Sequence, residues 1–379
     1  MIIGNNKIKI GITGQNGFIG THLYNTIGLL AEQFERIEFQ KSFFSSPTLL
    51  DSFTSQCDVI VHLAALNRHN DSEIIYTTNI DLVSKIIASC NRTNSQPHIL
   101  FSSSTQEEKD NLYGKSKKEG RLLFENWAQE NNAIFSGLII PNVFGAFGNP
   151  FYNSVVATFC YQLTHNETPK IEIDGDLKLI YIENLVKLII EQIQHPKGQI
   201  NNINILHNYE IKVSLLLDKL MNFKSRYYEK GEIPDLNNEL DRNLFITFLT
   251  YIDHKSFFPF KLKMNTDNRG SFVETIKLGS GGQISFSTTI PGITRGNHYH
   301  TRKAERFAVI RGKAQIELRR INTSEILSFE LNGNEPSFVD MPIWYTHNIK
   351  NIGEDYLYTI FWINEFFDSN DPDTYFENV

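Results

Sequence analysis

Three histidines and one glutamate in the second half of the chain have the spacing of a metal-binding site. His298 and His300 are two residues apart, Glu305 follows after a predicted turn, and His347 lies on a distant predicted strand. Residues two apart on a strand face the same side, so the first two imidazoles can point inward together. Three imidazoles and one carboxylate suit zinc or another divalent first-row metal ion. We therefore predict a metal site at these four residues.

Tyr113 and Lys117 form a second candidate site, because residues four apart share one face of a helix. A phenol with a pKa of about 10 is a poor acid at neutral pH. A neighbouring ammonium stabilises the phenolate and lowers that pKa toward the working range. The same lysine can bind the ribose of a nicotinamide. The serines Ser102–Ser104 end a predicted strand, where one hydroxyl can hydrogen-bond a substrate oxygen.

A glycine-rich segment near the N-terminus, Thr13–Gly20, is typical of a dinucleotide-binding loop. It lies between a predicted strand at residues 7–12 and a predicted helix at residues 17–30, which is the context that this motif requires. Glycine allows a close approach to a pyrophosphate, and the helix N-terminus offers free N–H groups. We predict that the cofactor contacts Gly14, Gly17, Phe18, Ile19 and Gly20.

The end of the second predicted strand bears on the choice of cofactor. NAD sites usually have an acidic residue there, which holds the ribose hydroxyls. This strand is predicted at residues 36–40 and ends Phe39-Gln40-Lys41, without an acid. Lys41 could pair with a 2′-phosphate, which favours NADPH over NAD. The alternative is a solvated surface lysine.

The pattern of predicted elements divides the chain into two domains. Strands and helices alternate over residues 7–195, which is typical of an α/β fold with a doubly wound, Rossmann-type parallel sheet. Residues 198–255 have a helical pattern and are interpreted as the end of this domain and a linker. From Ser256 onward, short strands and frequent turns predict an all-β jelly-roll barrel. We therefore predict domains at residues 1–255 and 256–379.

Composition excludes several classes of protein. The 379 residues carry a net charge of -7, which argues against a nucleic-acid partner, because phosphate binding depends on clustered lysine and arginine. Residues 1–9 lack the apolar segment of a signal peptide, and no stretch approaches the roughly 18 apolar residues that span a bilayer. Cys57, Cys90 and Cys160 are far apart and predict no disulfide framework. We expect a cytoplasmic protein without membrane contact.

Residues 7–250 resemble the extended short-chain dehydrogenase/reductase family. The resemblance rests on the glycine loop, the Tyr-x-x-x-Lys pair, and the segments Asp58–Ala65 and Pro141–Gly145. It implies that Tyr113 is the acid, Lys117 its helper and Ser104 the third member, with Ser103 as the fallback. It also implies cofactor contacts at Leu63, Ala64 and Ala65, and a nucleotide-sugar contact at Asn142. The dehydratases of this family have an Asp-Glu pair where this chain has Thr105-Gln106, which indicates a plain reductase.

The spacing of the metal ligands resembles the two motifs of the cupins, whose fold is a small jelly roll. Trp344 stands where the second motif usually has a glycine. The segment Asp267–Glu274 is similar to the leading strand of the deoxysugar 3,5-epimerase cupins. This similarity implies a substrate-binding role for Arg269, with a structural salt bridge as the alternative. Tyr299, Lys303 and Tyr345 lie near the ligands in sequence and remain open as the base of an epimerisation.

The whole chain resembles the CapF/WbjC-type capsular and O-antigen enzymes of the UDP-N-acetyl-L-fucosamine pathway. The most specific strings are Asn149–Tyr161, which contains the predicted substrate contact Asn153, and the C-terminal Trp362–Asp368 and Asp371–Phe376. The resemblance implies a homodimer and a UDP-sugar substrate, UDP-2-acetamido-2,6-dideoxy-β-L-arabino-hexos-4-ulose. The barrel, with its metal, would epimerise C3, and the α/β domain would then reduce C4 with NADPH. The implied product is UDP-2-acetamido-2,6-dideoxy-L-talose.

Two other interpretations remain open from the residues. The first is a nucleotide-sugar 4-epimerase or dehydratase that holds NAD tightly and carries a structural cupin. It predicts turnover without net consumption of the cofactor. The second is a non-catalytic nucleotide-sensing or scaffold protein, which predicts that Tyr113→Phe leaves function intact. A structural role for the metal is compatible with either.

Overall fold

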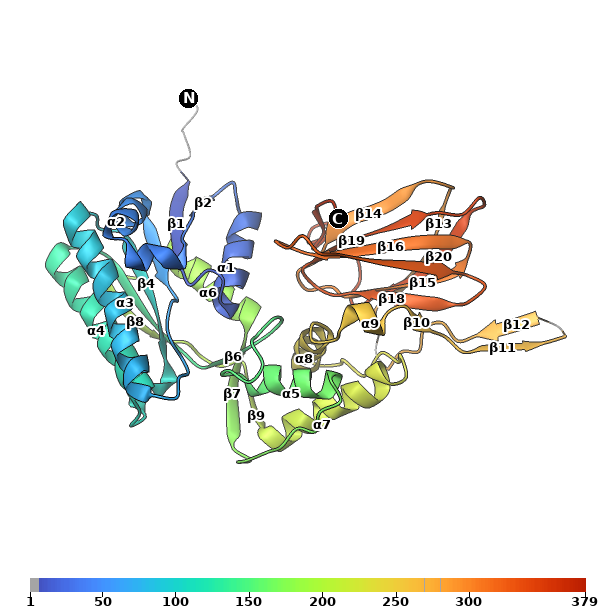
Figure 1. Cartoon of the computed structure of the whole chain (residues 1–379), viewed down its shortest axis with the longest axis horizontal. Coiled ribbons are helices and arrows are strands. Elements are labelled where there is room, and N and C mark those ends of the chain that lie inside the picture. Colours follow the sequence, from blue (N-terminus) through green and yellow to red (C-terminus); the bar gives the residue numbers. More distant parts are fainter. Residues whose placement is uncertain (1–6, 269, 280) are drawn as a thin grey trace, which may run out of the picture. The chain divides into compact units, whose positions relative to one another are not determined.

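The computed structural model describes residues 7–268, 270–279 and 281–379, and the chain forms two compact units (Figure 1). The first unit contains the chain up to Thr158 and Gly175–Lys212, and the second contains Phe159–Asp174 and Val213–Val379. Each unit is described by itself below. Among the described residues, every helix is too short or too polar to cross a membrane.

The first unit is built on a six-stranded parallel sheet of order β2-β1-β3-β4-β5-β8. The chain moves from β1 to one neighbour, β2, and then crosses to the other, β3. In such sheets, ligands bind at the carboxyl ends of the strands where the order reverses. The strands are β1 (Ile8–Thr13), β2 (Phe34–Ile37), β3 (Val59–His62), β4 (His98–Ser104), β5 (Phe135–Ile140) and β8 (Ile200–Asn204).

Helices cover both faces of this sheet, as Figure 1 shows. Helices α2, α3 and α4 pack side by side, and α1 packs against α6. A small sheet of order β6-β7-β9 completes the unit. The helices are α1 (Phe18–Leu29), α2 (Pro47–Gln56), α3 (Ser72–Thr93), α4 (Leu112–Asn131) and α6 (Ile182–Gln194), and the small strands are β6 (Asn142–Phe144), β7 (Asp176–Tyr181) and β9 (Tyr209–Lys212).

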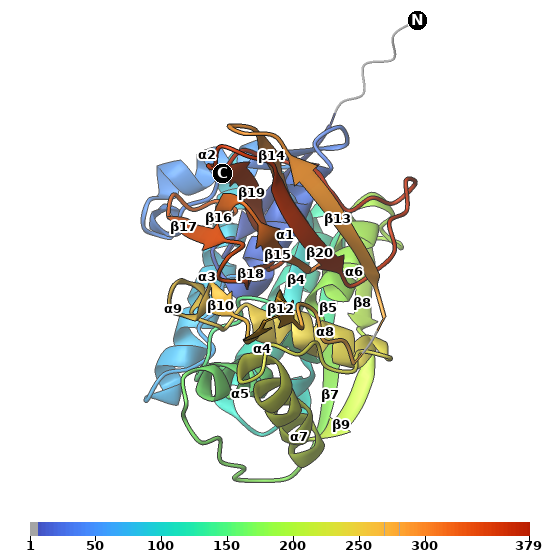
Figure 2. The ribbon, with the colours of Figure 1, turned by 90° about the vertical axis from the view of Figure 1, so that its right-hand side faces the viewer.

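The second unit contains two five-stranded antiparallel sheets, which enclose a core that includes Ile316, Leu318, Phe338 and Val339 (Figure 2). One sheet has the order β10-β18-β15-β20-β13 and the other β17-β16-β19-β14-β21. The strands are β10 (Phe260–Lys261), β13 (Gln283–Thr289), β14 (Thr294–Tyr299), β15 (Glu305–Arg311), β16 (Lys313–Arg320), β17 (Ile326–Asn332), β18 (Ser337–Met341), β19 (Tyr345–Asn351), β20 (Leu357–Ile363) and β21 (Tyr375–Phe376), with a separate hairpin of β11 (Met264–Asp267) and β12 (Gly270–Val273). The predicted fold class, a Rossmann-type sheet followed by an all-β barrel, is confirmed.

Helices of the second unit pack onto the barrel through a buried ion pair. Arg306 on β15 is fully buried and donates to Asp340 on β18 at 2.8 and 2.9 Å. The Tyr227 hydroxyl also donates to Asp340, and Arg306 donates to the Gly231 carbonyl at 2.6 Å. This unit therefore includes part of the segment that the sequence pattern assigns to the first domain, while the domain boundary at Ser256 stays a prediction. The helices are α5 (Val155–Thr164), which crosses the division between the units, α7 (Val213–Phe223), a π-helical turn (Lys224–Tyr228), α8 (Glu239–Leu249) and α9 (His254–Phe257).

Candidate functional site

The glycine loop follows β1 and precedes α1, as predicted. Gly14 has φ 75, and a Cβ there would lie 2.9 Å from the Ala64 backbone nitrogen. A Cβ on Gly20 would collide with the Gly14 carbonyl. Gly17 caps α1 without a side-chain hydrogen bond, so the first N–H groups of the helix, at Phe18 and Ile19, are left for a ligand. The loop has the geometry that pyrophosphate binding requires.

The segment after β3 lies against this loop. The Leu63 N–H donates to the Thr13 carbonyl at 3.1 Å, and the Ala64 N–H donates to the Thr13 hydroxyl at 3.3 Å. These contacts place the predicted cofactor residues Leu63, Ala64 and Ala65 beside Gly14, at the point where the strand order reverses. The cofactor roles of both segments stay predictions.

The second strand ends earlier than the sequence pattern predicts, which corrects the predicted absence of an acid after it. β2 ends at Ile37 rather than at residue 40, so the first residue after the strand is an acid, Glu38. Its carboxylate accepts a hydrogen bond from Gln40 Nε2 at 2.7 Å. Lys41 begins a short 3-10 helix (Lys41–Ser45) and is exposed. Both a ribose-binding acid and a phosphate-binding lysine are therefore present near the strand end, and the preference for NADPH stays a prediction.

Tyr113 and Lys117 lie in the first turns of α4, which the amino-terminal cap and a close packing contact hold in place. The Asn111 side chain accepts from the Gly114 N–H at 2.7 Å. A Cβ on Gly114 would collide with the Gln106 carbonyl, so only glycine allows this approach to the 3-10 helix Thr105–Glu108. The turn is therefore fixed beside the end of β4, which carries the serines.

A hydrogen-bond chain connects Lys117 to the glycine loop. The Lys117 ammonium donates to the Ser102 carbonyl at 2.8 Å. The Ser102 hydroxyl donates to the His62 carbonyl at 3.3 Å, and the His62 ring shares a 2.9 Å hydrogen bond with the Thr13 hydroxyl. The ammonium also lies 5.9 Å from the centre of the Tyr113 ring. The two predicted sites of the first unit therefore belong to one connected region.

Burial dominates the electrostatics of this pair, contrary to the expectation from spacing alone. Burial and the nearby Tyr152 raise the pKa of Tyr113 to about 12, although a hydrogen bond with Ser104 acts in the opposite direction. Burial also lowers the pKa of Lys117 to about 8, against an opposing effect of Glu107. The expected fall in the phenol pKa is therefore not found in this arrangement, because burial raises that pKa instead.

The structure distinguishes between the two candidate serines. Ser104 accepts from the Gln106 N–H at 3.2 Å and lies at the Tyr113 hydroxyl. Ser103 instead donates to the Glu107 carboxylate, and Arg121 holds that carboxylate with contacts of 2.8, 2.9 and 3.2 Å. The geometry therefore favours Ser104 over Ser103 as the third member. The contacts with Ser103 and Arg121 also occupy the Glu107 carboxylate, so this acid does not replace the Asp-Glu pair that the dehydratases have at the two preceding positions.

Asn142 and Asn153, the predicted substrate contacts, are both exposed in the first unit. Tyr152 beside Asn153 is a residue that sequence reasoning missed, although it lies within the quoted string. Its hydroxyl accepts from the Asn67 N–H at 3.1 Å, and it is close enough to Tyr113 to raise the pKa of that phenol. Asn67 follows β3, so the contact joins segments that are distant in sequence. No local pattern could have predicted it.

The four predicted metal ligands come together between the two sheets of the barrel. One donor atom from each of His298, His300, Glu305 and His347 lies within 4.8 Å of every other. Oε2 of Glu305 is 3.1 Å from Nε2 of His347, 3.3 Å from Nε2 of His300 and 3.9 Å from Nε2 of His298. In tetrahedral zinc sites with bonds of about 2.0–2.2 Å, neighbouring ligand atoms are about 3.4 Å apart. The donor set therefore fits a divalent metal ion.

The charges in this cluster support the same conclusion. Nε2 of His300 is buried and faces Oε2 of Glu305 at 3.3 Å. Burial would raise the pKa of Glu305, but the three imidazoles hold it well below its ordinary value. Burial would lower the pKa of His300, but its contact with Glu305 raises it. The cluster thus favours a carboxylate that faces a positive charge, which is the electrostatic requirement of a cation site.

The candidate bases are held by other contacts. The Tyr299 ring stacks between Trp344 and Tyr375 at 5.7 and 5.4 Å. The Lys303 ammonium is buried and donates to the Pro372 carbonyl at 2.7 Å. Burial raises the pKa of Tyr345. Trp344 has φ 60, the left-handed region that favours glycine, which explains why the family motif has a glycine at this position. The structure assigns no base among the three.

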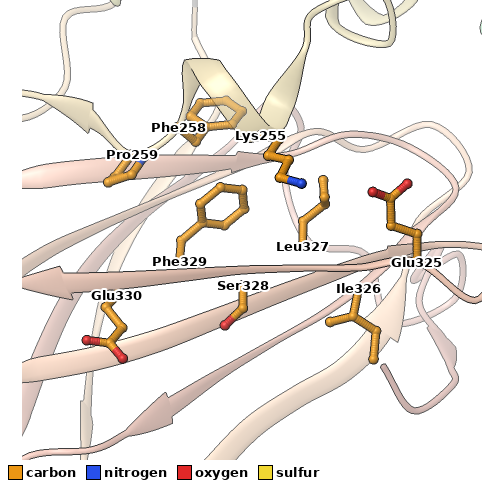
Figure 3. A pocket seen from close by; sticks show the side chains of 9 residues that line it. All are labelled: Lys255, Phe258, Pro259, Glu325, Ile326, Leu327, Ser328, Phe329 and Glu330. Carbon is orange, nitrogen blue, oxygen red and sulfur yellow. The ribbon is translucent and has the colours of Figure 1, made fainter.

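The second unit also contains a predicted substrate contact and a pocket away from the histidine cluster. Arg269, the third predicted substrate contact, lies outside the described residues. A pocket of about 320 Å³ lies beside β17. Figure 3 shows its lining, in which Lys255, Phe258 and Pro259 face residues 325–330. Its lining, all within the described chain, shares no residue with the histidine cluster. We assign no ligand to this pocket.

Comparisons with known proteins agree with both halves of this geometry. Residues 10–205 match the NAD dependent epimerase/dehydratase family, and residues 265–375 match the polysaccharide biosynthesis C-terminal domain. The UDP-2-acetamido-2,6-beta-L-arabino-hexul-4-ose reductase of Pseudomonas aeruginosa is 32% identical over 97% of this chain and 98% of its own. The crystal structure of the capsular polysaccharide assembling protein CapF from Staphylococcus aureus is 34% identical over 98% of this chain and 100% of its own, with a TM-score of 0.61. The chain belongs to the CapF-type family.

More distant matches cover only part of the chain. The UDP-glucose 4-epimerase of Thermotoga maritima covers 64% of this CapF-type chain at 16% identity, with a TM-score of 0.54, and this likeness concerns the fold alone. The spore coat polysaccharide biosynthesis protein SpsL of Bacillus subtilis is 25% identical over 123 residues, which are 30% of this chain. These two proteins thus match only part of the chain, while the CapF-type proteins match nearly all of it.

Proposed function

We propose that this protein is a bifunctional nucleotide-sugar enzyme with a C3-epimerase and an NADPH-dependent C4-reductase activity. The substrate would be UDP-2-acetamido-2,6-dideoxy-β-L-arabino-hexos-4-ulose and the product UDP-2-acetamido-2,6-dideoxy-L-talose, on the route to UDP-N-acetyl-L-fucosamine. The observation that carries the proposal is the relation, over nearly the whole chain, to a reductase of such a 4-keto sugar. The Tyr113–Lys117 pair beside the glycine loop supplies the matching chemistry.

In the reduction, Tyr113 would donate the proton and Ser104 would hold the C4 oxygen. NADPH, when bound, supplies the hydride that adds to C4. The carbon–oxygen double bond then becomes a hydroxyl when the phenol proton passes to the oxygen. The Lys117 ammonium would stabilise the resulting phenolate. Because the pKa of Lys117 is about 8, this group can also exchange protons near neutral pH.

The glycine loop and the segment after β3 would hold the cofactor. The pyrophosphate would bind the N–H groups at the start of α1, with Gly14, Gly17 and Gly20 allowing its close approach. Lys41 would bind the 2′-phosphate. Asn142 and Asn153 would contact the nucleotide sugar, and we extend the same role to Arg269.

In the epimerisation, the histidine cluster would act on the neighbouring carbonyl. A divalent ion at His298, His300, Glu305 and His347 would supply positive charge to stabilise an anionic substrate. The proton at C3 is acidic only while the C4 carbonyl is present. The epimerisation must therefore precede the reduction, which consumes that carbonyl. Zinc is the ion that this donor set favours.

The proposal includes a homodimer in the cytoplasm. β13 lies at the edge of its sheet, and it exposes two large apolar residues, Ile284 and Phe286, by 54% and 72%. A second copy that covers this strand would bury both and pair the open edge. The three cysteines are buried free thiols, which fits a reducing compartment.

Oxidation of NADPH by the 4-keto UDP-sugar tests the reductase half. We expect the native chain to sustain the oxidation of NADPH. For Tyr113→Phe we expect kcat to fall about 100-fold or more, because this is the usual contribution of a positioned acid. Far-ultraviolet circular dichroism of the variant checks its folding. Turnover without net NADPH consumption would indicate the tightly held NAD of a 4-epimerase instead. Unchanged turnover in the variant would contradict the role of Tyr113.

A further inference from the structure

The residues Asp371–Glu377, here called the C-terminal strap, lie along the strands that carry the metal ligands. Its strand β21 pairs with β14, with Phe376 opposite His298 and Tyr375 opposite Tyr299. The Glu377 N–H donates to the Asn297 carbonyl at 3.0 Å. The Thr346 hydroxyl, next to His347 on β19, donates to the Glu377 carbonyl. The strap therefore contacts both histidine-bearing strands.

Asp373 makes the direct contact between the strap and a metal ligand. Its backbone carbonyl lies at Nδ1 of His300. A carbonyl oxygen can only accept a hydrogen bond, so Nδ1 of His300 must carry the hydrogen. In a neutral imidazole, Nε2 then keeps its lone pair, and this is the atom that faces Glu305 at 3.3 Å. The contact therefore selects the tautomer that a metal ion requires.

The Asp373 side chain also fixes the loop between His300 and Glu305. One carboxylate oxygen accepts from the Thr301 N–H at 3.0 Å and from its hydroxyl at 2.7 Å. The other accepts from the N–H groups of Arg302 and Lys303 at 3.0 and 3.1 Å. The side chain is buried, and the residue has φ 40. A single aspartate thus holds a ligand ring and the loop that spaces two ligands.

We propose that Asp373 is a positioning residue of the metal site, which sets the tautomer of His300 and the separation of His300 from Glu305. The inference rests on the metal site of the proposed function and extends it to a residue about 70 positions away in the chain. Removing partners of this kind commonly weakens metal binding about 10- to 100-fold.

Asp373→Asn is the appropriate variant, because asparagine has the same shape and tolerates a positive φ. Its amide has one acceptor oxygen, so at least one of the three backbone N–H groups of the loop loses its acceptor in either orientation. We expect zinc affinity, measured on the full-length protein by competition with a chromophoric chelator, to fall about 10- to 100-fold. Asp371→Asn is the matched control.

The control changes the same charge two residues away on the same strap. The Asp371 carboxylate contacts the Arg302 guanidinium at 2.8 and 3.1 Å, and the Asp371 side chain is 66% exposed. Its variant should keep the native zinc affinity within about threefold, as expected for an exposed ion pair. Equal losses in the two variants, or no loss in Asp373→Asn, would overturn the proposal.

A second readout does not depend on metal binding, and it is recorded at a pH high enough to keep the His300 ring neutral. Nitrogen-15 NMR of histidine-labelled, metal-free native protein reports which ring nitrogen of His300 carries the hydrogen, with His300→Gln used to assign the signal. The Nδ1–H form supports the proposal, and the Nε2–H form overturns it. If native protein binds no zinc but shows the Nδ1–H form, the metal site of the proposed function fails while the positioning by Asp373 stands.

Discussion

Replacing Lys117 by methionine should remove activity and stabilise the first unit at the same time. The ammonium is buried in α4, 3% exposed, and lies 5.1 Å from the centre of the Phe101 ring. Methionine has a similar length and no charge, so it fits the same apolar surroundings. We expect kcat for the reduction to fall about 100-fold or more, because the phenolate of Tyr113 loses its stabilising cation.

The gain in stability follows from the pKa of Lys117. Burial lowers this pKa from 10.5 to about 8, and at about 1.36 kcal/mol for each pKa unit the charged lysine costs the folded state about 3 kcal/mol. The variant leaves the Ser102 carbonyl without the ammonium as a donor, which costs about 1–3 kcal/mol. The expected net gain at neutral pH is therefore about 1 kcal/mol, with a range of about 0–2 kcal/mol.

The stability advantage of the Lys117→Met variant should shrink as the pH rises. Below pH 8, the lysine is charged in both the folded and the unfolded state, and the full penalty applies. Between about pH 8 and 10.5, the folded state loses its proton first, so the penalty shrinks and then disappears. Hydrogen–deuterium exchange of β4 and α4 peptides in a urea series measures this local stability. A variant that is less stable at pH 7, or an advantage that grows with pH, would refute the reasoning.

Three further substitutions probe the nucleotide and metal sites. Gly20→Ala should weaken NADPH binding about 5- to 150-fold, because overpacking costs about 1–3 kcal/mol. Calorimetry should find no change for Gly175→Ala, whose new Cβ meets open space. Lys41→Ala should lower the ratio of kcat/KM for NADPH to kcat/KM for NADH. If Glu38→Ala lowers kcat/KM for NADH more than Lys41→Ala lowers kcat/KM for NADPH, the acid holds the ribose instead. Glu305→Gln should lower the zinc content measured by atomic emission and slow the exchange of the C3 proton with solvent deuterium. NADPH affinity should stay unchanged. Full zinc occupancy in this variant would count against the ligand set.

Features with short-range causes could be predicted from the sequence. The glycine loop depends on a strand, a turn and a helix within about twenty residues, and each is visible in the local pattern. The metal cluster could also be predicted, because alternation along a strand and the distance to His347 are properties of spacing. The two fold classes follow from the change in periodicity along the chain.

Features that depend on long-range packing could not be predicted. Tyr152 meets Asn67 and Asp373 meets His300 only after folding, and no spacing indicates either contact. The pKa of Tyr113 depends on burial, which a Tyr-x-x-x-Lys pattern does not report. The sequence pattern extends β2 three residues beyond its end at Ile37, and Glu38 then falls inside the predicted strand instead of after it. The part of the second unit formed by Val213–Phe257 has a helical pattern that gives no sign of its packing on the barrel.

The central claim is that one chain epimerises C3 and then reduces C4 of the same sugar. NMR of the 4-keto UDP-sugar incubated with the protein in deuterium oxide, with and without NADPH, tests it most directly. The account predicts deuterium at C3 without NADPH, and a 4-hydroxy product of talo configuration that appears only with NADPH. A 4-hydroxy product without deuterium at C3 would contradict the account, because reduction would then have occurred without epimerisation.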